Sequence, residues 1–252
     1  MLPAFLKPFE AEIKKYETSA IRVHARPLDT SILEDPLDLK TSKFLGKPFF
    51  PLSKEYPFDK SGNPMVLAAQ INFSEIPSFE HFPSSGILQL FLSTLDWYEE
   101  DTKIIFHNEE DLKEDHVNNF DFLTEENYDG IPFFKIHELS FTEMIDVGSH
   151  EDEKFDLSFN GETFWDYYDQ LDKAKANELL SYFQGGGHKM GGYSFFMQSD
   201  PRDKTHNEIQ LLQIDVDEEI EIGDGGLIHI FINKEDLLKQ NFEKAYFHWD
   251  CG

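Results

Sequence analysis

The segment HKMGGYSFFMQSDPR, residues 188–202, contains the side chains best suited to chemistry. Histidine, lysine and arginine can bind anions, and the adjacent glycines let the backbone approach a ligand closely. A phosphate-binding P-loop is excluded, because GGGHKMGGY lacks the final Lys-Ser or Lys-Thr pair of that motif. A G-x-G-x-x-G loop is excluded too, because Met190 stands where the last glycine is required. The alternative is that these glycines only end a helix and turn the chain into a strand.

Eight residues in and after this segment are candidate ligand-binding residues, and none of them is assigned a catalytic role. All carry polar or charged side chains in the loop or close to the strands after it: His188, Lys189, Gln198, Asp200, Arg202, Gln213, Asp215 and Asp224. Asp200 precedes a proline, which favours a turn in which the Arg202 guanidinium pairs with the carboxylate. A structural clamp is therefore the alternative to a binding role for these two residues.

Nucleophilic and metal chemistry find little support in the sequence. No G-x-S-x-G motif is present, and the single cysteine, Cys251, is the penultimate residue. Zinc is disfavoured because HELSF, residues 137–141, lacks the second histidine of the H-E-x-x-H motif. The segment around ENYDGI resembles part of an EF-hand loop, but Glu125 and Ile136 replace its first aspartate and its closing glutamate. The sequence therefore assigns no metal ligand and identifies no cofactor.

The chain is strongly acidic, with 49 Asp and Glu against 22 Lys and Arg and a formal net charge of -27. Much of this charge lies in one segment, because residues 96–156 contain 20 acidic and 4 basic side chains. Such a surface repels nucleic acids and anionic membranes, so neither is an expected partner. It attracts a basic protein or hard cations, and Asp215, Asp217 and the acids up to Asp224 form a candidate group for calcium.

Three blocks of sequence occur twice in the same order. The first set is SKFLGKPFF (42–50), LAAQINF (67–73) and GILQLFL (86–92), and the second is HKMGGYSFF (188–196), QLLQIDV (210–216) and GLIHIFI (226–232). The kept order and the nearly kept spacing predict an internal duplication of residues 42–92 and 188–232. The expected product is two similar β repeats about a pseudo-twofold axis, which share a core or face each other across a groove.

Hydrophobic periodicity predicts mixed or antiparallel β-sheets and a few peripheral helices. The blocks LAAQINF and QLLQIDV alternate apolar and polar side chains, as strands with one buried face do. The blocks GILQLFL and GLIHIFI are apolar on both faces except at Gln89 and His229, so we expect them to be covered on both sides.

Other segments complete the expected organisation. Helical spacing predicts helices over residues 8–18 and 162–183, and Asn233 is a capping residue for a short third helix. The N-terminus lacks the pattern of a signal peptide, and no uninterrupted apolar run approaches the roughly 18 residues of a membrane span. We therefore expect one cytoplasmic domain, residues 1–252, in which residues 96–156 are an acidic connector between the repeats.

Several motifs in these blocks are similar to those of the YwqG-like family of bacterial proteins. They are K-x-x-G-x-P-x-x-P at 43–51 with MVLAAQINF, HKMGGY with Q-x-D-P-R at 188–202, LLQID at 211–215, IGDGG at 222–226 and the closing FEKAYFHWDC. Leu45 departs from the family pattern, which often has a second glycine there. The resemblance implies an α+β fold and a bacterial, cytoplasmic setting. The family is a domain of unknown function, so the resemblance implies no activity.

The leading hypothesis is a non-catalytic binding protein whose acidic surface engages a basic protein partner. Genes for similar proteins can lie near secreted toxin systems, so the resemblance adds an immunity-like role towards a toxin. One alternative is a small-molecule binder or an enzyme, with a pocket between the two repeats lined by the candidate residues. Another alternative is a calcium-binding acidic protein.

Overall fold

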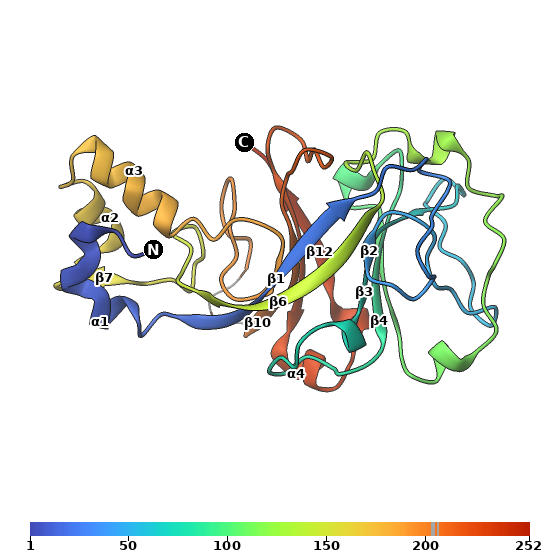
Figure 1. Cartoon of the computed structure of the whole chain (residues 1–252), viewed down its shortest axis with the longest axis horizontal. Helices are drawn as coiled ribbons and strands as arrows, with labels where there is room; N and C mark the ends of the chain where they lie inside the picture. The colour runs from blue at the N-terminus through green and yellow to red at the C-terminus, as the bar shows by residue number, and fades with distance from the viewer. Residues whose placement is uncertain (203–204, 206) are drawn as a thin grey trace.

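One antiparallel sheet of ten strands organises the computed structural model, which describes residues 1–202, 205 and 207–252 (Figure 1). The strands lie in the order β12-β11-β10-β9-β1-β6-β2-β3-β4-β5, and each neighbouring pair is antiparallel. Their bounds are β1 (Thr18–Pro27), β2 (Lys43–Phe44), β3 (Val66–Asn72), β4 (Ile87–Leu92), β5 (Thr102–His107), β6 (His137–Asp146), β9 (Lys189–Gly191), β10 (Glu208–Ile214), β11 (Leu227–Asn233) and β12 (Tyr246–Asp250).

Short helices and a small hairpin surround this sheet. The α-helices are α1 (Glu10–Ile13), α2 (Phe164–Tyr168), α3 (Lys173–Tyr182) and α4 (Lys234–Leu238), the hairpin is β7 (Ser158–Phe159) with β8 (Glu162–Thr163), and the 3-10 helices are η1 (Ala4–Phe9), η2 (Phe73–Glu75), η3 (Trp97–Glu99), η4 (Asp111–Lys113), η5 (Glu125–Tyr128) and η6 (Phe242–Lys244). In Figure 1, α1, α2 and α3 gather at one end of the molecule. In the described part of the chain, no helix is long and apolar enough to cross a bilayer. The expected α+β class with peripheral helices is confirmed.

The sheet consists of two halves that meet where β1 pairs with β6. This seam joins Thr18 to Asp146 at one end and Pro27 to His137 at the other. The first half is β6-β2-β3-β4-β5, and the second half is β1-β9-β10-β11-β12, so both have the same strand order outward from the seam. Each half also has a register shift at the same place, between Leu67 and Ala69 in β3 and between Gln210 and Leu212 in β10.

The main core lies between the inner faces of the two halves. In Figure 1, β10 and β12 stand opposite β2, β3 and β4. Apolar side chains from both sides belong to one cluster: Val66, Ala68, Leu88, Leu90, Leu92, Leu211, Ile214, Ile228, Ile230 and Ile232. Burial of each valine, leucine or isoleucine side chain in this cluster stabilises the folded state by about 1.5–3 kcal/mol. The strands β4 and β11 are buried along almost their whole length, so the prediction that both are covered on two sides is confirmed.

A second, smaller core joins the N-terminal segment to the helical end. Its members are large apolar side chains from these two regions: Leu6, Ile13, Phe155, Leu157, Phe159, Phe164, Leu179 and Phe183. The expected single helix over residues 162–183 is wrong, because the structure has two helices, α2 and α3. The Asp172 side chain accepts a hydrogen bond from the Lys175 N–H, which caps and begins α3 as a separate helix.

The expected helix over residues 8–18 is also wrong in extent. Pro8 lies in the 3-10 helix η1, and α1 adds one turn that ends at Ile13. Thr18 already belongs to β1, because pairing along the whole seam with β6 outweighs the helical preference of the sequence before it. The acidic connector is partly folded, since it supplies β5 and β6.

Candidate functional site

The glycine loop, residues 184–192, is held in place by a buried glutamine. Gln213 on β10 donates from Nε2 to the carbonyl oxygens of Gly185 and Gly187, at 3.1 and 2.9 Å. Its Oε1 accepts from the Phe195 N–H at 2.9 Å. Gln213 is fully buried, so its amide fixes the loop and is not available to a ligand from solvent.

Lys189 forms a buried ion pair below the same loop. Its Nζ donates to Asp146 Oδ2 at 2.7 Å, and both side chains are almost completely buried. Burial lowers the pKa of Lys189, and the neighbouring Asp146 charge opposes that shift. The same carboxylate oxygen accepts from the Tyr193 N–H at 3.1 Å. Because separating a buried pair leaves an uncompensated charge, Lys189 has a structural role here.

His188 connects the loop to the turn that follows β10. Its Nδ1 accepts from the Asp215 N–H at 3.0 Å, so Nε2 carries the proton in the neutral ring. That Nε2 lies 3.4 Å from Asp217 Oδ2. Burial by itself would raise the pKa of Asp217, but hydrogen bonds from His188 and from the Glu219 N–H outweigh it and lower the pKa. Asp215 Oδ2 in turn accepts from the Gly187 N–H at 2.5 Å.

Arg202 lies in a buried clamp of two carboxylates, so the predicted pairing of Asp200 with Arg202 is present. The guanidinium donates from Nε and NH2 to Asp200 at 2.8 and 2.6 Å, and from NH2 to Asp152 at 2.7 Å. It also lies over the ring of Phe231, with 4.9 Å between the guanidinium carbon and the ring centroid. No sequence motif indicates Asp152 as a partner, because that residue is far from Arg202 in the chain and lies in a long acidic run.

The last two candidates lie near the end of the chain. Gln198 donates from Nε2 to the Cys251 carbonyl oxygen at 2.8 Å. Asp224 is exposed, and its carbonyl oxygen accepts from the Gly252 N–H at 3.4 Å. The eight candidates are therefore distributed over three places, namely the glycine loop, the clamp and this end of the second half. They do not line one pocket together: Lys189 and Asp215 help to line a pocket of about 350 Å³ at the glycine loop, whereas Arg202 helps to line a different one.

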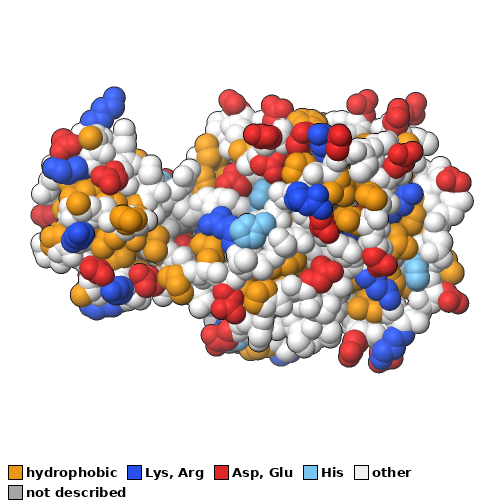
Figure 2. All heavy atoms as spheres, viewed as in Figure 1, with side chains coloured by type: hydrophobic (Ala, Val, Ile, Leu, Met, Phe, Trp, Pro, Cys, Tyr) orange, Lys and Arg blue, Asp and Glu red, His pale blue; other side chains and the backbone are white. Residues whose placement is uncertain are grey.

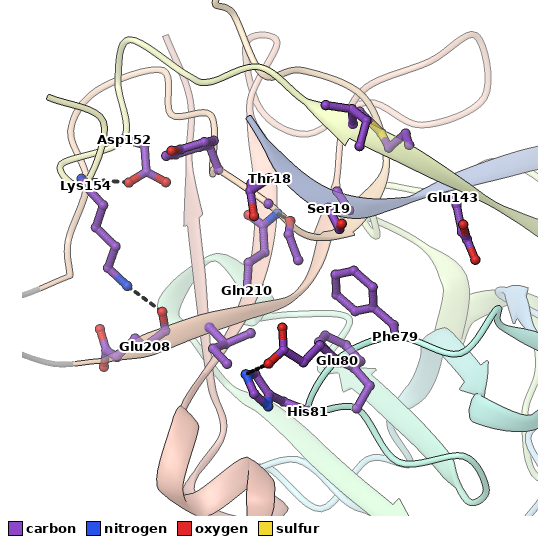
Figure 3. Close-up of a pocket in the computed structure, with 18 of the residues that line it drawn as sticks. Thr18, Ser19, Phe79, Glu80, His81, Glu143, Asp152, Lys154, Glu208 and Gln210 are labelled. Atoms are coloured by element: carbon purple, nitrogen blue, oxygen red, sulfur yellow. Dashed lines mark hydrogen bonds and ion pairs between the residues drawn. The ribbon is translucent and has the colours of Figure 1, made fainter. Parts of the chain in front are cut away.

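A groove of about 830 Å³ lies beside the clamp, and Arg202 is the candidate residue that helps to line it. The start of β1, the end of β6, the start of β10 and the loop 78–82 surround the groove (Figure 3). Figure 3 shows its labelled polar and aromatic side chains around an open centre: Thr18, Ser19, Phe79, Glu80, His81, Glu143, Asp152, Lys154, Glu208 and Gln210. No sequence motif indicates these residues as a site, because they come from segments that are distant in the chain.

Gln210 connects this groove to the buried outer face of the second half. Its Nε2 donates to the Gly191 carbonyl oxygen at 3.1 Å, and its Oε1 lies 3.3 Å from His229 Nδ1. Because an amide oxygen only accepts, His229 Nδ1 carries the proton. Burial lowers the pKa of His229, so this ring is neutral at physiological pH.

The acidic connector forms a different feature on the first half, which we call the connector surface. It consists of exposed carboxylates and two exposed rings: Glu99, Glu100, Glu109, Glu110, Glu114, Asp115, Asp121, Glu125, Glu126, Asp129, Phe58 and Phe122. Both rings pack against Tyr56, at centroid distances of 6.4 and 4.9 Å. Figure 2 shows many carboxylates along the upper edge of the sheet-bearing part of the molecule, and both this part and the helical end carry charges of both signs.

The described residues contain no group of three or more His, Cys, Asp or Glu side chains arranged to hold a metal ion. The calcium group expected after β10 is therefore not supported by geometry. Asp215 and Asp217 instead accept hydrogen bonds from the N–H groups of Gly187 and Glu219.

The fold and these sites define an α+β protein built on one antiparallel sheet with two matching halves. Residues 42–251 match DUF1963, a domain of unknown function, and the chain belongs to that family. No curated protein matches the chain. Family membership therefore assigns no activity, which has to be inferred from the sites.

Proposed function

We propose that the protein is a non-catalytic binding protein whose connector surface engages a basic protein partner. The observation that carries this proposal is the exposure of two aromatic rings among carboxylates. Phe58 and Phe122 are 47% and 42% exposed, and Tyr56 beneath them holds both in place. Aromatic side chains supply much of the binding energy at protein interfaces, and the surrounding charges select the sign of the partner.

The electrostatics of this surface support a basic partner. The exposed cations on the segments that form it are Lys54, Lys60, Lys103 and Lys113, of which Lys54 is paired with Asp111 at 2.7 Å and Lys113 with Glu110 at 2.9 Å. The ten exposed carboxylates therefore outnumber the nearby cations and act on an approaching partner. Such a field accelerates association with a positive surface, and the acceleration falls as salt screens the charges.

Two variants with the same change of charge test the proposal. The connector variant combines Glu109→Lys, Glu110→Lys, Glu125→Lys and Glu126→Lys, and the control combines Glu17→Lys, Glu162→Lys, Asp169→Lys and Glu178→Lys at the helical end. Each protein is immobilised and exposed to lysate at low and at moderate salt. We expect the wild type and the control to retain a partner, with weaker retention at moderate salt, and the connector variant to lose it.

Chemical cross-linking then locates the bound partner. A lysine-reactive cross-linker should join the partner to Lys103 or Lys113, since both lie within the connector surface. Failure of the wild type to retain any protein at either salt concentration contradicts the proposal. Equal loss of binding in both charge variants contradicts it as well, because the effect would then come from net charge alone.

The finer identity of the chain is part of the same proposal. The motifs shared with YwqG-like proteins support membership of that group, a bacterial cytoplasmic setting and a partner of the toxin class. The common strand order and the matching register shifts support an origin of the two halves by duplication. A sequence search begun from residues 188–232 of many family members should retrieve their residues 42–92, and failure across the family would favour convergence.

A further inference from the structure

The sheet has a gap where β9 is too short to separate β1 from β10 along their length. β9 pairs with β1 at Ala20 to Arg22 and with β10 at Gln213. Beyond β9, the first residues of β1 pair only with β6, and the first residues of β10 pair only with β11, among the described residues. In the part of the chain that the structure describes, the edges of β1 and β10 that face each other are therefore unpaired there. The 830 Å³ groove lies at this gap, with Thr18 and Ser19 on one side and Glu208 to Gln210 on the other.

The first half shows how such a position can be filled by an extended segment. The chain that leads into β6 pairs with the turn after β10, through an antiparallel bridge between Phe133 and Ile220. Two backbone hydrogen bonds complete this contact, from the Phe134 N–H to the Glu219 oxygen and from the Glu221 N–H to the Pro132 oxygen. The corresponding turn of the first half, residues 74–82, makes no such bridge to the described part of β1. Its Phe79 ring instead lies against Gly191.

One backbone group at the edge of β10 already faces the groove. The Glu208 carbonyl oxygen accepts from Lys154 Nζ at 2.5 Å. In an extended strand the N–H and the C=O of one residue point to the same side, so the Glu208 N–H faces the groove as well. This edge therefore offers both a donor and an acceptor to an added strand, once the Lys154 side chain moves aside.

The charges around the groove favour a basic occupant. Arg202 is neutralised by Asp152 and Asp200, which leaves Lys154 as the unpaired cation of the described lining. Against it stand the carboxylates of Glu80, Glu143 and Glu208, of which Glu80 lies 3.1 Å from His81 Nε2 and Glu208 accepts from the Tyr246 hydroxyl at 3.0 Å. The Phe79 and Phe82 rings add apolar surface and a site for cation–π contact with lysine or arginine.

We infer that this groove binds an extended, basic segment of a partner protein, which adds as a strand to the free edge of β10. Backbone hydrogen bonds to Glu208 and Gln210 hold the segment, and its lysine or arginine side chains meet Glu143, Glu208 and Glu80. The site lies on the second half and is independent of the connector surface on the first. Either site can therefore be present without the other.

A defined peptide tests the inference by fluorescence anisotropy. The probe is a fluorescein-labelled ten-residue peptide that alternates threonine and lysine, because threonine favours strands and lysine supplies the charge. The same peptide with glutamate in place of lysine should not bind. Two further peptides carry methyl groups on backbone amide nitrogens, one peptide at every threonine and the other at every lysine. Strand addition requires that at least one of them binds at least about tenfold more weakly, since methylation removes the donors on one edge.

Matched variants locate the binding site. Glu143→Lys with Glu208→Lys should weaken binding of the lysine peptide at least about tenfold, because like charges then face each other. Ser19→Trp should have a similar effect by filling the groove, and circular dichroism checks that it folds. Glu162→Lys with Glu178→Lys makes the same charge change at the helical end, outside both proposed binding surfaces, and should leave binding within about twofold. The inference is overturned if both methylated peptides bind within about twofold of the unmethylated peptide, or if both groove variants bind the lysine peptide as the wild type does, and neither result bears on the connector surface.

Discussion

The two halves of the sheet have the same strand order, but their outer faces are filled differently. In the first half, Phe50, Met65, Leu67 and Phe91 form an apolar cluster. At the corresponding positions the second half keeps the rings as Phe196 and Phe231, while Gln210 replaces Leu67. Arg202 covers these rings and is held by two buried carboxylates. The outer face of the first half also buries polar side chains, Gln89 and His107, but Arg202 and its carboxylates bury charge in the second half. Because charge is costlier to bury than a neutral polar group, this clamp places the structural specialisation beside the groove.

Other features are shared by the two halves and concern the loops between strands. Lys43 pairs with Asp35 at 2.8 Å, as Lys189 pairs with Asp146 at 2.7 Å. Gln70 accepts from the Phe49 N–H and donates to two backbone carbonyl oxygens, which is the pattern of Gln213. The comparison teaches that the buried lysine and glutamine maintain the fold in both halves. The groove and the connector surface are where the halves differ.

The largest effect is expected from Arg202→Met, which has no counterpart in the first half. It leaves Asp152 and Asp200 buried without their cation, so the free energy of unfolding should fall by about 4–5 kcal/mol. Urea unfolding at neutral pH measures the change. The triple variant that adds Asp152→Asn and Asp200→Asn should recover part of it. A loss below about 1 kcal/mol would mean that the clamp is not desolvated as described.

Lys43→Met and Lys189→Met test the shared ion pairs and should resemble each other. Each leaves one buried carboxylate unpaired, so each should lower the free energy of unfolding by about 3–4 kcal/mol. The two losses, measured by the same urea titration, should agree within about 1 kcal/mol if the pairs are equivalent. A much smaller loss for one variant would break the correspondence between the halves at that point.

His107 gives the first half a pH-dependent contribution to stability, and the corresponding position in the second half is occupied by Asp250. Burial lowers the pKa of His107 from 6.5 to about 4, and Lys54 adds to this shift while Asp111 opposes it. The unfolded chain therefore binds the proton first, and the stability from this neutral ring is lost as pH falls from 6.5 towards 4. Between pH 7 and pH 5, titration of His107 should lower the free energy of unfolding by about 2 kcal/mol.

Thermal unfolding of His107→Gln at the two pH values checks this share. The variant should show a smaller drop in melting temperature between pH 7 and pH 5 than the wild type. His24→Gln, which changes an exposed histidine on β1, should keep the wild-type drop. If His107→Gln also keeps it, His107 is not the group that titrates.

The smallest effect is expected where Leu45 and Gly191 occupy matching backbone positions. Both have a left-handed φ, +57° for Leu45 and +66° for Gly191, and only glycine adopts it without strain. Leu45→Gly relieves that strain but exposes a cavity in the core, so the net loss should be about 1–2 kcal/mol. Differential scanning calorimetry measures it. A gain in stability would show that strain outweighs packing at this turn.

The sequence predicted the repeated strands well because their information is local. Alternation in LAAQINF and QLLQIDV, and the apolar runs around Gln89 and His229, depend only on neighbours along the chain. The helix break before Asp172 was missed, because an aspartate on a helix surface and an aspartate that caps a new helix look the same in sequence. The pairing of Asp200 with Arg202 is predictable from the sequence, because only Pro201 separates the two residues and their opposite charges lie within one turn.

The sites themselves depend on contacts between distant segments, which periodicity does not reveal. Asp152 meets Arg202 only after the second half has folded, and nothing near Asp152 distinguishes it from other acids in the connector. The groove arises from the shortness of β9, which follows from the left-handed backbone of Gly191 and Gly192 at its end. The glycine pattern predicts a loop, but the gap between β1 and β10 is a property of the assembled sheet.

At the seam, β1 belongs to the half whose other strands come last in the chain, and β6 belongs to the half whose other strands come earlier. This arrangement has a consequence for synthesis of the chain. β1 is made first, yet its partners β6 and β9 belong to much later segments. While the nascent chain emerges from the ribosome, β2 to β5 lack β6, and β1 has no ladder partner until β6 and β9 follow. Pairings so distant in sequence form slowly and leave strand edges open meanwhile. We expect the emerging polypeptide to depend on chaperones until β6 closes the seam, and isolated halves produced separately to aggregate.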